Sequence, residues 1–259
     1  WLRFRYGQQK EKTMIVTMTD EGWDVIHQPA HALLACKIAY QWKVNERSPF
    51  WVELLTAITQ HDNQQRGLEG DIYLTSTGAP KGFTVSKGEG DVDSLEQPQE
   101  VIHQARYQGQ YVALLTSMHV HTLYKAKRGS SNPLDKFLTE IEKQQKDWRK
   151  SLEISAKQAK ADYALLLWCD RCSLILCQDE IPAGERRLEV QRGPNGTRHF
   201  LWQREDKTLT VEAWPFEEDE FSVNVEVHKL KQLKFESETE LRQALQAAEV
   251  EFRSWTFKK

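Results

Sequence analysis

The sequence contains no apolar run that approaches the roughly 18 residues of a membrane-spanning helix. Its start also lacks the apolar core of a secretory signal peptide. Residues 1–13 are basic and polar and stand before Met14, so we expect a leader or expression-derived segment there and leave it out of the fold. We therefore expect no membrane partner.

An excess of positive charge is missing as well. The 35 Lys and Arg residues are balanced by 38 Asp and Glu residues, which gives a formal net charge of −3. A chain without an overall basic field has no general attraction for nucleic acid. Nucleic acid is therefore not the expected partner, and the composition leaves the oligomeric state open.

Cysteine is scarce, with four residues in 259. Cys169 and Cys172 form a single C-x-x-C, and no second pair follows that would complete a zinc ribbon or a disulfide framework. Free cysteines are among the most buried residue types, so buried reduced thiols are favoured over metal or redox use. This pattern predicts a reducing, cytoplasmic compartment.

Two predicted helices bring the first candidate ligands. Pro29 suits the first turn of a helix, whose inward face carries His31 among apolar residues. A second helix over residues 50–60 ends at His61 and Asp62, and two adjacent residues at a helix end can bind one ion from neighbouring corners. The alternative for His31 is a core histidine satisfied by a hydrogen bond.

Three further candidates lie on later predicted helices. His103 stands beside apolar residues after Pro98, and His119 shares the buried face of the helix over 111–124. Asp170 lies in the middle of an apolar helix over 163–177, where a carboxylate is costly unless it is paired, hydrogen-bonded or bound to a metal. A salt bridge with Arg171 is the structural alternative.

The pattern as a whole predicts a mainly α fold. A hairpin over 14–26 opens a helical core over residues 14–181, and a long weakly periodic segment over 67–98 is either a substrate-facing loop or disordered. From residue 182 onward alternating strands predict a smaller β-rich subdomain, a β-meander plus one helix, over 182–259.

The order His, His-Asp and distant Asp resembles the HD superfamily of helical metal-dependent phosphohydrolases over about residues 27–178. The resemblance implies an HD-like helical bundle that binds one or two divalent ions, namely Fe, Mn or Zn. The implied metal ligands are His31, His61, Asp62 and Asp170, with His103 and His119 for a second ion.

Four shorter stretches resemble a bacterial domain-of-unknown-function family that is related to HD proteins. They are Pro29–Trp42, Gly78–Phe83, Trp168–Asp170 and Trp214–Phe216. Members of that family continue after His-Asp with a further Asp and a Gly-Trp pair. Here Asn63, Gln64 and Gln65 stand instead, so the resemblance assigns no role to a third acid.

The expected function is metal-dependent hydrolysis of a small-molecule phosphate ester, with nucleotides among the candidates. The ion would activate a water molecule, and Asp62 would act as the catalytic residue that orients it. Arg66, Lys125 and Arg171 are near these residues in the sequence and would offset the phosphate charge.

Two other function classes stay open. Some HD relatives hold two irons and activate dioxygen, so an HD-type di-iron oxygenase is one alternative. The other is a non-catalytic, metal-containing module that binds a ligand or a protein, which the departure after Asp62 would suit.

Overall fold

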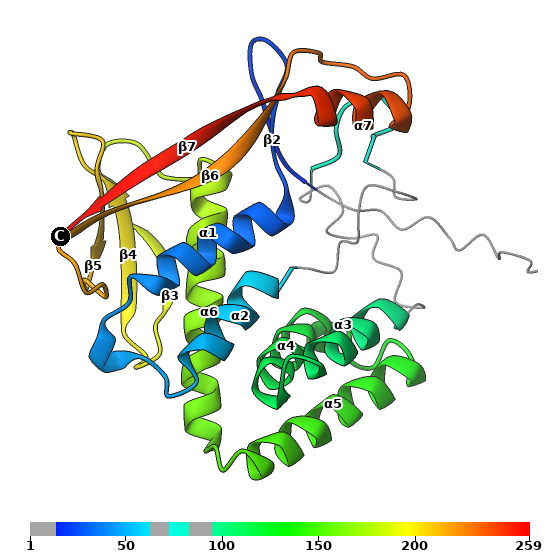
Figure 1. The fold of residues 1–259 in the computed structure, drawn as a ribbon, viewed down its shortest axis with the longest axis vertical. Coiled ribbons are helices and arrows are strands. Elements are labelled where there is room, and N and C mark those ends of the chain that lie inside the picture. The colour runs from blue at the N-terminus through cyan, green and yellow to red at the C-terminus, as the bar shows by residue number, and fades with distance from the viewer. Residues whose placement is uncertain (1–13, 63–72, 83–94) are drawn as a thin grey trace, which may run out of the picture. The chain divides into compact units, whose positions relative to one another are not determined.

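The computed structural model describes residues 14–62, 73–82 and 95–259. Of these residues, 48% are helical and 22% are in strands or bridges. The helices in chain order are α1 (Gln28–Tyr40), η1 (Val44–Glu46), α2 (Trp51–Gln60), α3 (Glu96–Arg106), α4 (Gln110–Tyr124), η2 (Lys125–Lys127), α5 (Asn132–Ser151), α6 (Ala156–Cys177) and α7 (Glu238–Ala247) (Figure 1). The strands are β1 (Ile15–Met18), β2 (Trp23–Ile26), β3 (Leu188–Arg192), β4 (Arg198–Gln203), β5 (Leu209–Glu212), β6 (Glu220–Leu230) and β7 (Glu249–Lys258).

The strands form one seven-stranded sheet in the order β1-β2-β6-β7-β5-β4-β3. The predicted hairpin is present, with Ile15 opposite Ile26 and Met18 opposite Trp23. Its second strand then pairs with β6, where Val25 lies opposite His228. The expected fold, a mainly α, HD-like helical bundle with a smaller C-terminal β-rich subdomain, is therefore wrong, because strands from both ends of the sequence share one sheet in a mixed α/β fold.

The C-terminal strands also connect differently from a simple meander. β3, β4 and β5 follow one another as antiparallel neighbours. β6 leaves that order to pair with β2, and β7 returns to lie parallel to β5 with Leu209 opposite Phe257. Alternation identifies strands but carries no information on which distant strand each one joins.

Close contacts divide the chain into two compact units. One contains Trp1–Gln28, Gln65–Gly90 and Glu226–Phe252, and the other contains Pro29–Gln64, Asp91–Val225 and Arg253–Lys259. The core of the first unit includes Met14, Val25, Tyr73, Leu230, Phe235, Leu241 and Leu245. The candidate ligands with described positions all belong to the second unit, and the sequence-based division at residue 181 stays a prediction.

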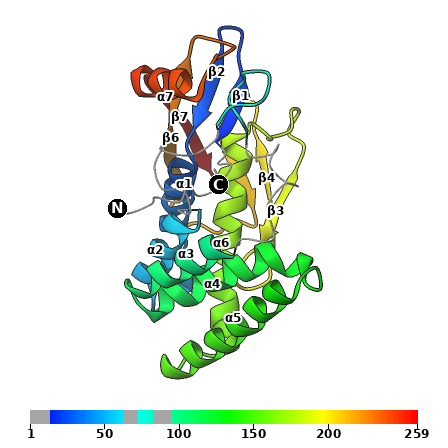
Figure 2. The ribbon, with the colours of Figure 1, turned by 90° about the vertical axis from the view of Figure 1, so that its right-hand side faces the viewer.

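Helix α6 has 22 residues, of which 12 are buried. It contacts α2, α4 and β3, and Figure 2 shows it running beside β3 and β4. Leu166, Trp168 and Ile175 are fully buried along it. Asp170 is thus carried on a rigid helix, which suits a side chain that must hold a fixed position.

The boundary between α5 and α6 lies inside a stretch of helical sequence pattern. Apolar residues at helical spacing favour one helix from residue 134 to 159, whereas α5 ends at Ser151. Glu153 has a φ of 56°, which interrupts the helical backbone. The Ser155 side chain accepts a hydrogen bond from the Gln158 backbone N–H and so begins α6.

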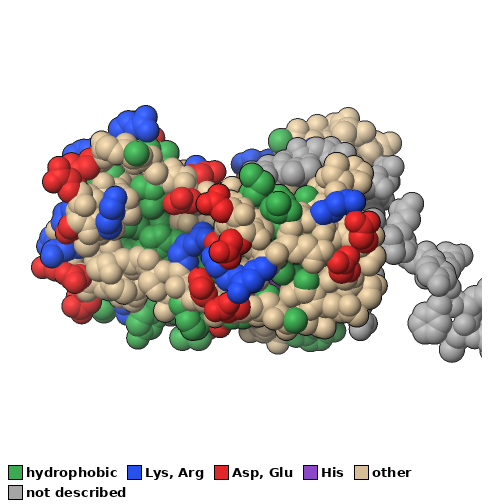
Figure 3. Space-filling view, turned by 90° about the horizontal axis from the view of Figure 1, so that it is seen from above, with side chains coloured by type: hydrophobic (Ala, Val, Ile, Leu, Met, Phe, Trp, Pro, Cys, Tyr) green, Lys and Arg blue, Asp and Glu red, His purple; other side chains and the backbone are tan. Residues whose placement is uncertain are grey.

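The surface in Figure 3 shows Lys and Arg side chains interspersed with Asp and Glu. This mixture agrees with the small net charge of −3. Among the helices in the described ranges, none has both the length and the apolar character needed to cross a membrane.

Candidate metal centre

Three helices bring four of the predicted ligands together. His31 lies in the first turns of α1, and Asp170 lies in α6. His61 is the residue that caps the end of α2, and Asp62 follows it outside the regular helix. The end of the helix lets both adjacent side chains approach the same point, as the sequence predicted.

The distances between the side-chain atoms define a compact cluster. Nε2 of His31 lies 2.8 Å from Oδ2 of Asp62 and 4.0 Å from Oδ1 of Asp170. Nε2 of His61 lies 3.2 Å from Oδ1 of Asp170 and 3.7 Å from Oδ2 of Asp62. One ligand atom from each of His31, His61 and Asp62 lies within 4.8 Å of the others.

These spacings suit a single divalent ion. An ion that binds nitrogen and oxygen at about 2.1 Å separates neighbouring ligand atoms by about 3.0–3.4 Å and opposite ones by about 4.2 Å. The four His-to-Asp separations of 2.8, 3.2, 3.7 and 4.0 Å lie close to these values. The ligand atoms that all lie within 4.8 Å of one another belong to His31, His61 and Asp62, and Asp170 adjoins this group through His61. Two imidazoles with two carboxylates and no thiolate suit Mn, Fe or Zn.

The orientation of His61 provides the most specific evidence for a cation. Its Nδ1 lies 2.7 Å from the carbonyl oxygen of Ile58, which can only accept, so Nδ1 carries a hydrogen. Its Nε2 is buried and faces carboxylate oxygens of Asp170 at 3.2 Å and of Asp62 at 3.7 Å. A ring nitrogen that faces two carboxylates in this way requires a positive charge between them, which is a proton when no metal ion is bound.

The pKa values of the cluster residues also reflect the need for a positive charge between the carboxylates. Burial alone lowers the pKa of His61, but the charges of Asp62 and Asp170 outweigh it and raise the pKa to about 9. Burial raises the pKa of Asp62, yet His61 and His31 hold it well below its usual range. Asp170 behaves in the same way, with its pKa lowered mainly by His61. Both acids are therefore ionised at neutral pH.

The cluster is accessible from one side through its carboxylates. The side chains of His31 and His61 are 0% and 1% exposed, whereas those of Asp62 and Asp170 are 30% and 17% exposed. The imidazoles thus form the floor of the site, and the acids lie at its opening. A catalytic metal site needs such an open side for water or substrate.

His119, on α4, lies at the edge of this cluster. Its ring centroid is 5.3 Å from that of His61 in an edge-to-face arrangement. Its Nδ1 is buried without a hydrogen-bond partner in the described ranges. Burial, with a contribution from His61, lowers the pKa of His119 to about 4, so this imidazole is neutral.

The remaining predicted site residues lie elsewhere. The His103 side chain is 53% exposed and lies 3.9 Å from Glu100, because the buried face of α3 is formed by Pro98, Ile102 and Ala105. His103 thus takes no part in the cluster.

The cations expected to contact phosphate have other surroundings. Arg171 pairs with Glu180 at 3.1 Å, and Lys125 is exposed in η2. Arg66 and the Asn63-Gln64-Gln65 stretch lie outside the described residues. Neither Arg171 nor Lys125 has a contact with the cluster among the interactions of the described residues.

Sequence reasoning missed Ser173, which hydrogen-bonds the ring nitrogen of His31 that does not face Asp62. Ser173 is fully buried, and its Oγ lies 2.9 Å from Nδ1 of His31. It follows Asp170 by three positions, so both residues occupy neighbouring positions on one face of α6. This spacing is the signal that could have pointed to it.

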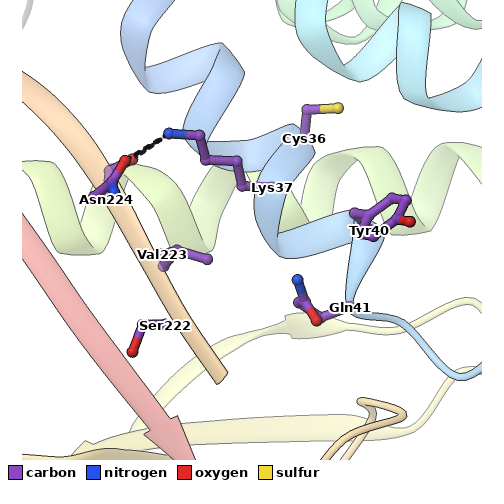
Figure 4. Close-up of a pocket in the computed structure, with 7 residues that line it drawn as sticks. All are labelled: Cys36, Lys37, Tyr40, Gln41, Ser222, Val223 and Asn224. Carbon is purple, nitrogen blue, oxygen red and sulfur yellow. Dashed lines mark hydrogen bonds between the residues drawn. The ribbon is translucent and has the colours of Figure 1, made fainter. Parts of the chain in front are cut away.

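A separate pocket of about 380 Å³ lies between α1 and β6. Figure 4 shows Lys37 and Asn224 joined across it, and the Lys37 ammonium donates to Oδ1 of Asn224 at 2.7 Å and to its carbonyl oxygen at 2.9 Å. None of the four cluster residues is among the described residues that line this pocket.

The comparisons with known proteins add a family but no activity. No curated protein and no solved structure matches the chain. One family model matches, and it covers residues 14–232, which include the whole cluster. The chain therefore belongs to the protein family of unknown function DUF3891.

Proposed function

We propose that the protein is a metal-dependent hydrolase that acts on a small-molecule phosphate ester. The observation that carries this proposal is the orientation of the buried His61 ring, whose Nδ1 bonds the Ile58 carbonyl oxygen while its Nε2 faces the carboxylates of Asp170 at 3.2 Å and Asp62 at 3.7 Å. Imidazoles and carboxylates that converge on one point from three helices form a typical divalent-ion site.

The proposed ligands are His31, His61, Asp62 and Asp170. When bound, the ion would lower the pKa of a water molecule toward about 7 and polarise a phosphoryl oxygen. The resemblance to HD phosphohydrolases supports the same assignment, and nucleotides belong to the substrate class that we would test first. We propose one ion, because His103, an expected ligand of the second ion, is 53% exposed and takes no part in the cluster.

The chain's own residues have distinct tasks in this proposal. The buried imidazoles fix the position of the ion from below, since they are almost inaccessible to solvent. Asp62 is the most exposed of the four and orients the attacking water at the open side. Water adds to phosphorus, the bond to the ester oxygen breaks, and the leaving alcohol takes up a proton.

An HD-type di-iron oxygenase is the second candidate. The observation that favours it is the third buried imidazole, because His119 lies beside His61 with an Nδ1 that lacks a partner in the described residues. Iron-dependent visible absorption that changes with oxygen would favour this candidate. A colourless protein loaded with Mn or Zn that hydrolyses phosphate esters would exclude it.

A reducing, cytoplasmic compartment remains part of the proposal. All four cysteines are free thiols, and three of them are buried. Burial raises the pKa of the Cys172 thiol, which keeps it protonated and unreactive. These observations support the prediction that the cysteines are structural.

The test combines metal analysis with a substrate screen. The protein is stripped with a chelator, reloaded anaerobically with Mn, Fe(II) or Zn, and tested on nucleotides and on nitrophenyl phosphate esters. We expect hydrolysis that depends on the ion and is lost in Asp62→Asn, while His103→Gln remains active. Stoichiometric metal binding with no hydrolysis of any phosphate ester would leave a non-catalytic metal-containing module as the function.

A further inference from the structure

A fully buried serine connects two of the proposed ligands. Oγ of Ser173 lies 2.9 Å from Nδ1 of His31, and both side chains are 0% exposed. The same hydroxyl donates a hydrogen bond of 2.9 Å to the backbone carbonyl oxygen of Asp170. Ser173 therefore contacts one ligand residue on α1 and the backbone of another on α6.

The donor and acceptor capacities fix the direction of these bonds. A serine hydroxyl has one hydrogen, and in Ser173 it is used by the carbonyl oxygen of Asp170, which can only accept. The bond to His31 must then run from the imidazole Nδ1–H to a lone pair on Oγ. Nε2 of the same ring hydrogen-bonds Oδ2 of Asp62 at 2.8 Å, and loss of that proton leaves the Nε2 lone pair facing Asp62 and the centre of the cluster.

We infer that Ser173 is a positioning residue that holds His31 in the tautomer and ring orientation required for metal binding. This inference rests on the proposed metal centre and adds to it a residue outside the set of direct ligands. Hydrogen bonds to the far nitrogen of a metal-binding histidine commonly fix its tautomer and raise its basicity. Ile58 does the same for His61 with a backbone carbonyl, which no substitution of a side chain removes.

Ser117 provides a matched control for the alternative that Ser173 has only a structural role. Ser117 on α4 is also fully buried, and its Oγ donates to the carbonyl oxygen of Leu114 three positions earlier, as Ser173 donates to that of Asp170. Ser117 differs because no imidazole bond to it is found among the described residues. Replacing either serine with alanine removes one buried hydrogen bond to a backbone carbonyl oxygen. Only Ser173→Ala also leaves Nδ1 of His31 without its hydrogen-bond partner.

The experiment compares Ser173→Ala with Ser117→Ala in the full chain. Zinc affinity is measured by competition with a chromophoric chelator, and thermal unfolding is measured on the metal-free proteins. We expect Ser173→Ala to bind zinc about 10–100-fold more weakly than the wild type, the usual cost of losing an outer-shell partner. We expect Ser117→Ala to keep the wild-type affinity, although both variants lose stability.

A second readout is independent of affinity. Nitrogen-15 NMR of the His31 ring in the zinc-loaded wild type is expected to show a protonated Nδ1, and a bare Nδ1 would overturn the inference. If Ser173→Ala does not fold, Ser173→Cys keeps a similar volume and hydrogen-bonds only weakly, and the same loss of affinity is expected. Equal affinities in the Ser173 and Ser117 variants would overturn the inference and leave the metal centre intact, whereas a wild type that binds no metal would overturn the metal centre itself.

Discussion

Nε2 of His31 and Oδ2 of Asp62 lie 2.8 Å apart, although 31 positions separate the two residues in the chain. The pair joins the first turns of α1 to the end of α2, and Asp170 approaches the same point from α6. Two imidazoles and two ionised carboxylates in such proximity are the arrangement on which the proposed metal centre rests.

Loss of one ligand should weaken metal binding severely. Asp170→Asn keeps the size of the side chain but removes the negative charge that lies 3.2 Å from Nε2 of His61. We expect zinc affinity to fall by more than about 100-fold, beyond the cost of losing an outer-shell group. The control is Asp147→Asn, an exposed position on α5. An Asp170→Asn protein that binds zinc as tightly as the wild type would remove Asp170 from the ligand set.

Metal affinity should increase with pH. In the metal-free protein Asp62 and Asp170 outweigh the effect of burial and raise the pKa of His61 to about 9, so the ion must displace a proton at neutral pH. We expect the affinity to rise by about tenfold per pH unit below pH 9 and to level off above it. Titrations across this interval with a noncompeting buffer measure the slope. A flat profile would show that His61 does not exchange a proton for the ion.

Acid should destabilise the fold through a histidine remote from the cluster. Burial, with a contribution from Lys43, lowers the pKa of His199 to about 4, and its ring packs against Trp168 with centroids 5.6 Å apart. Between pH 6.5 and 4 the unfolded chain binds more protons at this residue than the folded one, so stability falls as the pH falls.

Replacing this histidine should remove part of that acid sensitivity. His199→Phe fits a site where Nδ1 has no hydrogen-bond partner among the described residues. We expect the variant to lose less stability than the wild type between pH 6.5 and 4, by up to about 2–3 kcal/mol. Denaturant titrations at several pH values measure the difference. Identical pH profiles would assign the acid sensitivity to other groups.

A buried carboxylate should depend on its hydrogen-bond donors. Asp162 is 5% exposed and accepts hydrogen bonds from the Tyr111 hydroxyl, from Ser48 at 2.8 Å and from Gln158 at 3.0 Å. Tyr111→Phe removes one hydrogen-bond donor from this buried carboxyl group, and we expect a loss of about 1–3 kcal/mol in the free energy of unfolding. Tyr107→Phe is the control because that side chain is 75% exposed. Equal stability of the two variants would contradict this assignment.

Local sequence patterns predicted the elements well and their assembly poorly. The hairpin of β1 and β2 was predicted from alternation and a turn, and the end of α2 was placed correctly at His61 and Asp62. The fold class was wrong because the pairing of β2 with β6 joins residues about 200 positions apart, and no local pattern records such a partner.

The sequence also predicted only part of the candidate site. His31 and Asp170 stood out because a polar group on an apolar helix face needs a partner, and the structure brings both to the His-Asp pair. His103 did not join them. It follows the buried Ile102, and adjacent residues on a helix point about 100° apart, so the His103 side chain turns away from the buried face of α3. Ser173 gave no signal by composition, since a buried serine resembles any other small helical residue until its partner is known.

The most direct test of the metal centre is anomalous X-ray diffraction from crystals of the zinc-loaded protein. We predict one strong peak within about 2.0–2.2 Å of Nε2 of His31, Nε2 of His61 and a carboxylate oxygen of Asp62 and of Asp170. A zinc-loaded crystal in which this position has no peak, while the four side chains are well ordered, would contradict the account.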